Sequence, residues 1–250
     1  KETEIESRGE NFHFQAPVTC SVTTIHSIAV GFGDGKVRFF VEGEKPRIID
    51  AHNGVVLSIA TNGEYIFTGG DDGRFLKLSQ NGDIVEIANF NSRWVDSVAA
   101  YKDSMVCSSG RNVYIWSGDQ KKAKSLEHSS TVGGLAFDHT GKRLAVSSYG
   151  GVTVWERGER RWTSKRLVWK GSHSKVGFSP DGKYIVTSMQ ESELHGWRLR
   201  DKVDLAMRGY PAKIKSFAWV GDTPHLATSG DHQAICCLLY TSPSPRDVEE

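Results

Sequence analysis

The feature that most constrains this chain is a hairpin pattern that returns about every 40 residues. Each copy is a short apolar strand ending in small residues, then a tight polar turn, then an alternating strand that closes on a large side chain. The copies are AVGFGDGKVRFF (29–40), FTGGDDGRFLKL (67–78), VCSSGRNVYIW (106–116), VSSYGGVTVW (146–155) and VTSMQESELHGW (186–197). The closing residues are Phe40, Leu78, Trp116, Trp155 and Trp197. The sequence therefore predicts a β-repeat architecture.

Each hairpin has neighbours that complete a four-stranded unit. One further strand precedes it, at 55–60, 94–100, 131–137, 173–178 and 213–219, and a more charged strand such as AKSLEH or SKRLVWK follows it. The glycines in GDG and DDG supply the positive φ that tight hairpin turns require. Small residues recur within the preceding strands, as expected where inner strands crowd around an axis: Ser58, Ser97, Gly134, Gly177 and Ser216. Four strands in about 40 residues predict one blade of an all-β propeller.

Composition agrees with this interpretation. The chain has 250 residues, 26 glycines and only 3 methionines, which favours many turns and short strands. A formal charge of +1 gives no global attraction to nucleic acid or to an anionic membrane, and no apolar run of about 18 residues could span a bilayer. The four cysteines follow neither a disulfide framework nor a CxxC pattern. We therefore expect a soluble cytoplasmic protein with no nucleic-acid or membrane partner.

Several of these segments resemble WD-repeat β-propellers. A histidine, then SPDGKYIVT, then a turn and a closing tryptophan make up the pattern, and the resemblance covers roughly residues 14–236. It is closest to uncharacterised bacterial WD-repeat proteins with stretches like STVGGLAFDHTGKRLAVSSYGGVTVW and GYPAKIKSFAW. The resemblance implies four-stranded blades, seven when complete, of which about six are represented here. It also implies a non-catalytic scaffold that is monomeric at full length.

The resemblance further implies a stabilising network of His, Ser/Thr, Asp and Trp in each blade. His52, Thr68 and Asp72 match its first three places, but Leu78 occupies the fourth. Tryptophan fills the closing place only at Trp116, Trp155 and Trp197, and none of these is followed by Asp. His128 begins another repeat, in which Gly150 and Gly151 stand where the turn aspartate would be. We therefore expect packing to hold the blades together.

The two ends differ from the repeats. Residues 1–13 are expected to form an N-terminal segment, and NFHFQAP (11–17) has the alternation of a ring-closing outer strand. Residues 14–236 are expected to form an incomplete propeller. A sixth hairpin, HLATSGDHQAICC, begins at residue 225. CLLYTSPSPRD (237–247) begins where this hairpin should close, and it resembles a translated sequencing adapter, so 237–250 are expected to be a non-native tail. A natural Pro/Ser-rich linker is the alternative interpretation.

Signatures of catalysis are few. No GxSxG, HExxH, P-loop or GxGxxG motif occurs, so we expect neither catalytic residues nor a cofactor. His173, His195 and Glu191 could approach one another as a metal site, but ordinary polar histidines are the favoured interpretation, and no metal is expected. The basic segment 156–175 could bind phosphate or an acidic partner. An outer strand whose charges guard a sheet edge is favoured there.

Partner-binding residues are expected where the inner strands begin, because the resemblance places those starts at the channel mouth. The candidates are Arg93, Trp94, His173, Tyr210 and Lys213. Arginine, tryptophan and tyrosine are enriched in binding hot spots. The resulting hypothesis is a scaffold for protein or peptide partners. The alternative is a propeller hydrolase or lactonase with a channel metal, which would need several inward carboxylates, of which Asp96 is one candidate.

Overall fold

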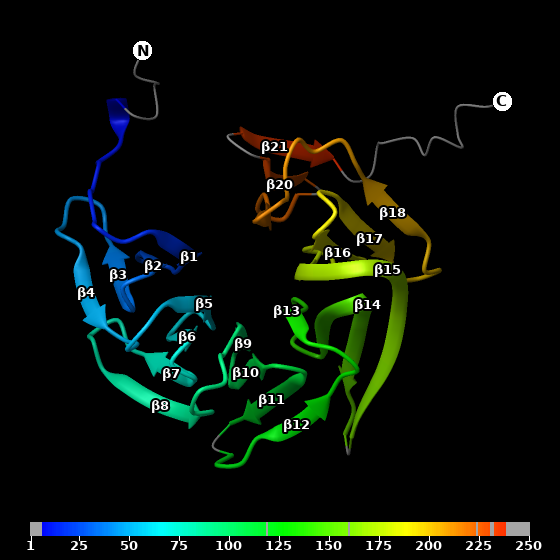
Figure 1. The fold of residues 1–250 in the computed structure, drawn as a ribbon, viewed down its shortest axis with the longest axis horizontal. Helices are drawn as coiled ribbons and strands as arrows, with labels where there is room; N and C mark the ends of the chain where they lie inside the picture. The colour runs from blue at the N-terminus through cyan, green and yellow to red at the C-terminus, as the bar shows by residue number, and fades with distance from the viewer. Residues whose placement is uncertain (1–6, 119, 160, 224, 231–232, 239–250) are drawn as a thin grey trace.

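The strands of the chain form an arc of antiparallel sheets around a central channel (Figure 1). The computed structural model describes residues 7–118, 120–159, 161–223, 225–230 and 233–238. The first three sheets have four strands each. They are β1 (Val18–Thr23), β2 (Ile28–Phe32), β3 (Lys36–Phe40) and β4 (Arg47–Asp50); β5 (Val56–Thr61), β6 (Ile66–Gly70), β7 (Arg74–Leu78) and β8 (Ile84–Asn89); and β9 (Ser97–Tyr101), β10 (Ser104–Ser109), β11 (Asn112–Ser117) and β12 (Lys124–Glu127).

The remaining strands form a six-stranded and a three-stranded sheet. The six-stranded sheet contains β13 (Val132–Phe137), β14 (Arg143–Arg157), β15 (Trp162–Phe178), β16 (Tyr184–Met189), β17 (Leu194–Arg198) and β18 (Asp204–Met207). The last sheet contains β19 (Phe217–Trp219), β20 (His225–Gly230) and β21 (Gln233–Leu238). No helix in the described part of the chain is long and apolar enough to cross a membrane.

The six-stranded sheet consists of two blades joined through β15. The first half of β14 pairs with β13 and its second half with β15, and the Arg157 amide donates to the Lys142 carbonyl at 2.8 Å, so β14 folds back on itself. β15 pairs with β14 from Trp162 to Val168 and again at Ser172, and it pairs with β16 from His173 onward. It is therefore the outer strand of the fourth blade and the inner strand of the fifth. The described residues thus represent six blades, as the sequence predicts.

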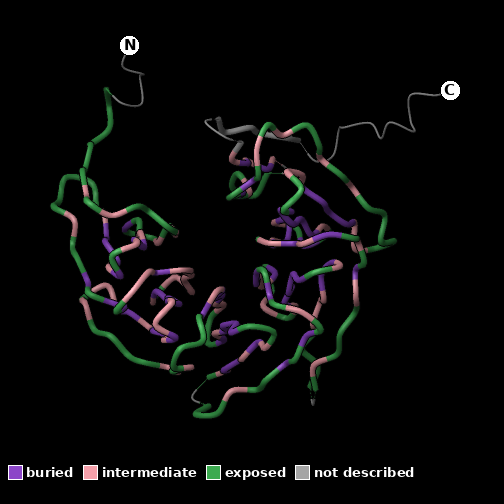
Figure 2. Tube along the Cα trace, in the orientation of Figure 1, coloured by how far each residue is buried: buried purple, intermediate pink, exposed green. Residues whose placement is uncertain are grey.

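The hydrophobic core lies between neighbouring blades. Each of five buried clusters combines residues from two successive blades; in one of them Val37 and Phe39 of the first blade pack with Leu76 and Leu78 of the second. Figure 2 shows buried residues gathered on the middle strands of the sheets and exposed residues along the outer rim. Because burial occurs mainly between blades, each blade depends on its neighbours for stability, as in other repeat proteins.

Strand registers agree with the repeat deduced from the sequence. The closing residues pair with the start of the preceding strand, as in Ile66 with Leu78 and Ile185 with Trp197. Leu226 pairs in the same way with Cys237, so β21 extends two residues into the predicted tail. Residues 239–250 of that tail lie outside the described residues. The conformations of the hairpin glycines also match, with φ of 78° at Gly35 and 79° at Gly73.

The N-terminal segment differs from the expected ring-closing strand. Residues 11–17 contain no strand, and Phe14 packs against Phe32 and Phe40 with ring centroids 5.3 and 6.1 Å apart. The guanidinium of Arg38 lies 4.5 Å from the Phe14 ring centroid. These residues of β2 and β3 form the side of the first blade that faces away from the second. The alternating phenylalanines therefore cover an apolar blade face instead of extending a sheet.

Candidate functional site

The second blade contains the hydrogen-bonded network expected from the resemblance. His52 donates from Nδ1 to Asp72 Oδ1 at 2.9 Å, since a carboxylate can only accept, and its Nε2 accepts from the Thr68 hydroxyl at 2.9 Å. The Asp72 carboxylate also accepts from the amides of Asn53 at 3.0 Å and Arg74 at 3.1 Å. The network thus ties the loop before β5 to the turn between β6 and β7.

Burial acts differently on the pKa values of the two titratable members of this network, His52 and Asp72. It lowers the pKa of His52, which keeps the ring neutral. Burial alone would raise the pKa of Asp72, but the amide of Asn53 and the His52 ring offset it, and the net direction is downward. Leu78 is fully buried at the fourth place and packs against the first blade. The network therefore ends at Thr68.

In the sixth blade a tyrosine occupies the place of the histidine. Thr228 pairs with Phe217 as Thr68 pairs with Ile59, and Tyr210 precedes Phe217 by seven residues, as His52 precedes Ile59. The Thr228 hydroxyl donates to the Tyr210 hydroxyl at 3.1 Å. Tyr210, a candidate partner-binding residue from the sequence, therefore contributes to the blade interior.

His173 also lies in the interior. Its side chain is 2% exposed, with Nδ1 2.8 Å from the Thr187 hydroxyl and Nε2 donating to the Trp169 carbonyl at 3.1 Å. In the second blade the histidine lies seven residues before the strand residue that pairs with the threonine. In the fifth blade Val176 pairs with Thr187, and the residue seven before Val176 is Trp169, so His173 contacts the threonine from only three residues before Val176. A histidine buried in this way has no surface to present to a partner, and the mouth position deduced from its sequence offset must be corrected.

His195 lies between two tryptophans. Its ring stacks on Trp169 at 3.9 Å and meets the edge of Trp197 at 4.6 Å. Neither ring nitrogen has a hydrogen-bond partner among the described residues, and burial lowers the pKa to about 4. The rings of His173 and His195 are 6.4 Å apart. No group of three or more His, Cys, Asp or Glu side chains in the described part of the chain could hold a metal ion.

The other closing tryptophans pack in different surroundings. Trp116 is 6% exposed and lies 5.5 Å from the ring of Phe75 in the preceding blade. Trp155 donates from its indole nitrogen to Nε2 of His128 at 3.1 Å. The closing position is therefore used for packing between blades in one repeat and for a hydrogen bond within the blade in another.

Three of the predicted residues remain exposed on loops that precede inner strands: Arg93, Trp94 and Lys213, here called the mouth surface. Trp94 is 58% exposed, and the guanidinium of Arg93 lies 5.8 Å from the Phe90 ring centroid. The loop is fixed because the amide of Val95, the next residue, donates to the Gly70 carbonyl at 3.0 Å. Lys213 stands in the corresponding place before β19.

The channel itself contains a cavity of about 570 Å³ lined by the inner strands. Its lining includes Lys175, Lys215 and several hydroxyl groups, and Lys175 Nζ donates to the Ser216 hydroxyl at 3.4 Å. Although Lys175 keeps contact with solvent in the channel, partial burial lowers its pKa. No Asp, Glu or His is among the described residues that line the cavity, so Asp96, the inward carboxylate considered from the sequence, does not line it.

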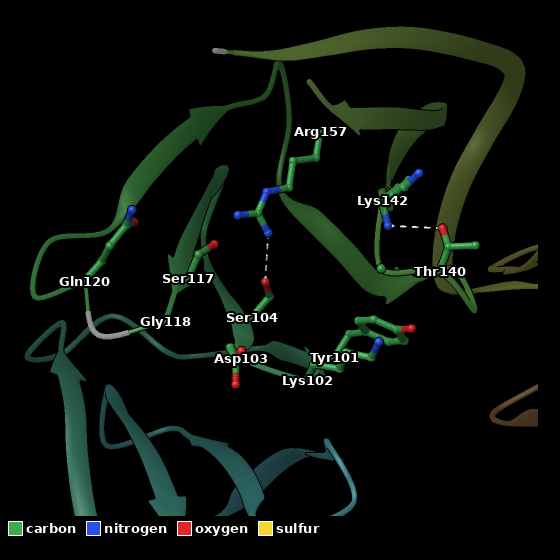
Figure 3. A pocket seen from close by; sticks show the side chains of 11 residues that line it. Tyr101, Lys102, Asp103, Ser104, Ser117, Gly118, Gln120, Thr140, Lys142 and Arg157 are labelled. Carbon is green, nitrogen blue, oxygen red and sulfur yellow. Dashed lines mark hydrogen bonds between the residues drawn. The ribbon is translucent and has the colours of Figure 1, made fainter. Parts of the chain in front are cut away.

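A second cavity, of about 470 Å³, is lined by residues of the third and fourth blades (Figure 3). Its lining includes Lys102, which follows β9, whereas Arg93 and Trp94 precede that strand, so the cavity and the mouth surface lie at opposite ends of β9. The cavity is lined by turn residues together with Arg157, whose side chain points toward Ser104 and donates to its hydroxyl at 3.4 Å. Sequence reasoning placed Arg157 in a basic outer segment and did not find this pocket, because the lining comes from two different repeats.

Comparison with known families gives two matches. The model of the WD domain, G-beta repeat, matches residues 43–75 and 120–156. The first match ends at Phe75 in β7, just after the turn that carries Asp72, and the second contains His128 and Trp155. Repeats of this kind typically form protein-interaction scaffolds. A comparison with curated protein sequences gives no significant match. The arc of four-stranded sheets and the two matched repeats together show that the chain has a WD-repeat β-propeller fold.

Proposed function

We propose that this protein is a non-catalytic scaffold that binds a protein or peptide partner through the mouth surface. The observation that carries the proposal is the exposed Trp94 beside Arg93 on a loop held by backbone hydrogen bonds. A rigidly held, solvent-exposed aromatic residue loses little entropy on binding and can bury a large apolar area. Lys213 adds a second cation to the surface.

The channel chemistry supports a binding role over hydrolysis. A propeller hydrolase with a channel metal would need inward carboxylates, whereas the described channel lining offers lysines and hydroxyls. The net charge of +1 gives no global basis for nucleic-acid binding. Cys20 and Cys107 are free thiols, which fits a protein that works in the reducing cytoplasm.

The proposal is tested by partner capture with the purified protein as bait. We expect Trp94→Ala, and the double variant Arg93→Ala with Lys213→Ala, to lose the captured partner while the melting temperature stays nearly unchanged, because exposed side chains contribute little to stability. Lys102→Ala with Lys142→Ala, at the opposite edge, is the matched control and should keep the partner. Equal capture by all variants would contradict the proposal, as would loss of capture that follows a loss of stability.

A further inference from the structure

One position of the inner strands that lines the channel cavity can be compared from blade to blade, because the strand registers agree. Ile59 pairs with Thr68 in the second blade as Val176 pairs with Thr187 in the fifth. In four blades the residue just before this pair is small: Ser58, Ser97, Gly134 and Ser216. In the fifth blade the residue at this position is Lys175, which therefore places a long cationic side chain where the other inner strands have small ones.

The small side chains at this position link neighbouring inner strands. The Ser58 hydroxyl accepts from the amide of Val98 in the next blade at 3.1 Å. Lys175 makes a link of the same kind, because its Nζ donates to the hydroxyl of Ser216 in the next blade at 3.4 Å. Since a serine is enough to link two inner strands, the link between blades does not explain why the fifth blade has an ammonium group here.

A second lysine lines the same part of the channel. Lys215 directly precedes Ser216, and both residues belong to the lining of the cavity. The contact between Lys175 and Ser216 places Lys175 beside the segment that carries Lys215, so the two positive charges lie on the same side of the channel. The inner strands β1, β5, β9 and β13 of the first four blades line the rest of the cavity (Figure 1).

The protein does not neutralise these two charges within the described residues. Neither lysine forms an ion pair there, whereas Lys36, for example, pairs with Asp50. Burial alone shifts the pKa of Lys175, downward, and no nearby carboxylate offsets it. The described lining of the cavity contains no acidic side chain. The lining therefore carries two positive charges and no negative one.

The size and the chemistry of the cavity suit a small phosphorylated molecule. A volume of about 570 Å³ is within the range of small-molecule sites. A phosphate monoester carries almost two negative charges at neutral pH, which matches two lysines, whereas a single carboxylate would neutralise only one of them. Its oxygens accept strong hydrogen bonds from ammonium groups and can also accept from hydroxyls. The lining supplies hydroxyls from every blade except the fourth: Thr19, Ser21, Ser58, Ser97, Ser174 and Ser216.

We propose that the channel binds the phosphate group of a small molecule between Lys175 and Lys215. The remainder of the ligand lies in the part of the cavity lined by the hydroxyl groups of the first three blades. The site shares no residue with the mouth surface and does not rest on the function proposed for that surface.

Binding is tested by amide chemical shifts at neutral pH and constant ionic strength, with glycerol 3-phosphate as the probe. We expect it to shift the amides of Ser174, Lys175 and Ser216, whereas glycerol, which has the same hydroxyls and no phosphate, leaves them in place. Inorganic phosphate should bind more weakly than glycerol 3-phosphate, because it leaves the hydroxyl-lined part of the cavity without a ligand.

Two substitutions test the role of the lysines. Lys175→Ser supplies the residue that other blades have at this position, so the fold should tolerate it, and Lys215→Gln removes the second charge. We expect each to weaken glycerol 3-phosphate by about tenfold, as for a lost charge-assisted hydrogen bond, with a nearly unchanged melting temperature. Lys121→Gln with Lys122→Gln, in the exposed loop between β11 and β12, removes two charges elsewhere and should leave binding unchanged.

Four outcomes would overturn the proposal. The first is no shift with glycerol 3-phosphate at millimolar concentration, and the second is the same affinity in the wild type and in both lysine variants. The third is tighter binding of succinate, which would replace the phosphate by a dicarboxylate. The fourth is a set of shifts confined to Arg93, Trp94 and Lys213, which would place the anion at the mouth surface. Because these titrations need no protein partner, their failure is distinct from a failure of partner capture.

Discussion

Tyr210 accepts a hydrogen bond of 3.1 Å from Thr228 in the sixth blade, at the position where His52 accepts one from Thr68 in the second blade. Tyrosine and histidine both present a polar atom at the end of a planar ring, so either can satisfy the buried hydroxyl of the threonine. Thr228 is 2% exposed and Thr68 is fully buried. The threonine thus recurs between blades, whereas the residue that pairs with it varies.

Removal of these hydrogen bonds should have unequal effects. We expect Tyr210→Phe to lower the free energy of unfolding by about 0.5–1.5 kcal/mol, the net contribution of one neutral hydrogen bond. Thr68→Val should cost more, about 1–3 kcal/mol, because it leaves the buried Nε2 of His52 without a donor. Urea denaturation measures both, and a Tyr210→Phe protein of unchanged stability would exclude the structural role of this hydroxyl.

Stability should fall with acidification below about pH 6.5. Burial lowers the pKa of His52, His128, His173 and His195 in the folded state, so below pH 6.5 the unfolded chain binds more protons than the folded one. For His195, whose folded pKa is about 4, the loss accumulates between pH 6.5 and 4.

His195→Phe isolates this effect. The phenyl ring keeps the stacking on Trp169 and has no nitrogen to protonate, so the dependence of unfolding free energy on pH should become shallower while stability at pH 7 is retained. His26→Gln, at an exposed position, is the control. Denaturant melts from pH 7.5 to 4.5 measure the slope. Identical slopes for wild type and His195→Phe would contradict the assignment.

The close approach of inner strands should make Gly134 intolerant of substitution. A Cβ atom there would lie 2.7 Å from the Ser174 carbonyl oxygen of the next blade, which is backbone and cannot move aside cheaply. We expect Gly134→Ala to destabilise the protein by about 1–3 kcal/mol through overpacking. Gly196→Ala, whose closest contact would be 3.0 Å, should cost less. The same cost for both would argue against crowding at the channel.

The phenylalanines before β1 should stabilise the first blade. Phe14 is half-buried against Phe32 and Arg38, whereas Phe12 is 42% exposed. We expect Phe14→Ala to cost about 1–3 kcal/mol, and Phe12→Ala less, in proportion to the apolar area that each buries. Thermal melts of the two variants check this order, and the reverse order would show that the segment packs differently.

Much of the fold could be predicted from the sequence because its signals are local. Glycines of positive φ fix the hairpin turns, and the alternation that ends at Leu78 or Trp197 fixes the strand register. The continuity of β15 across two blades could not be predicted, because Gly171, with φ of 127°, lets the chain pass from one blade to the next without a loop.

The candidate site was less predictable because it depends on contacts between distant segments. His173 was predicted to lie on the surface because it stands at the start of an inner strand. In the structure Trp169 occupies the position of the network histidine, and His173 turns inward to Thr187. Tyr210 could have been recognised as a structural residue from its spacing to Phe217. In the fourth blade the missing aspartate was visible in the sequence, but the approach of Arg166 from another strand was not.

The central claim, that the mouth surface binds a partner, is tested most directly by site-specific photo-crosslinking in cells. A photoreactive amino acid at position 94 should give a discrete adduct that disappears when Arg93→Ala and Lys213→Ala are added, while the same amino acid at position 102 gives none. An adduct of the same size from both positions, or an adduct at position 94 that survives the double substitution, would contradict the claim.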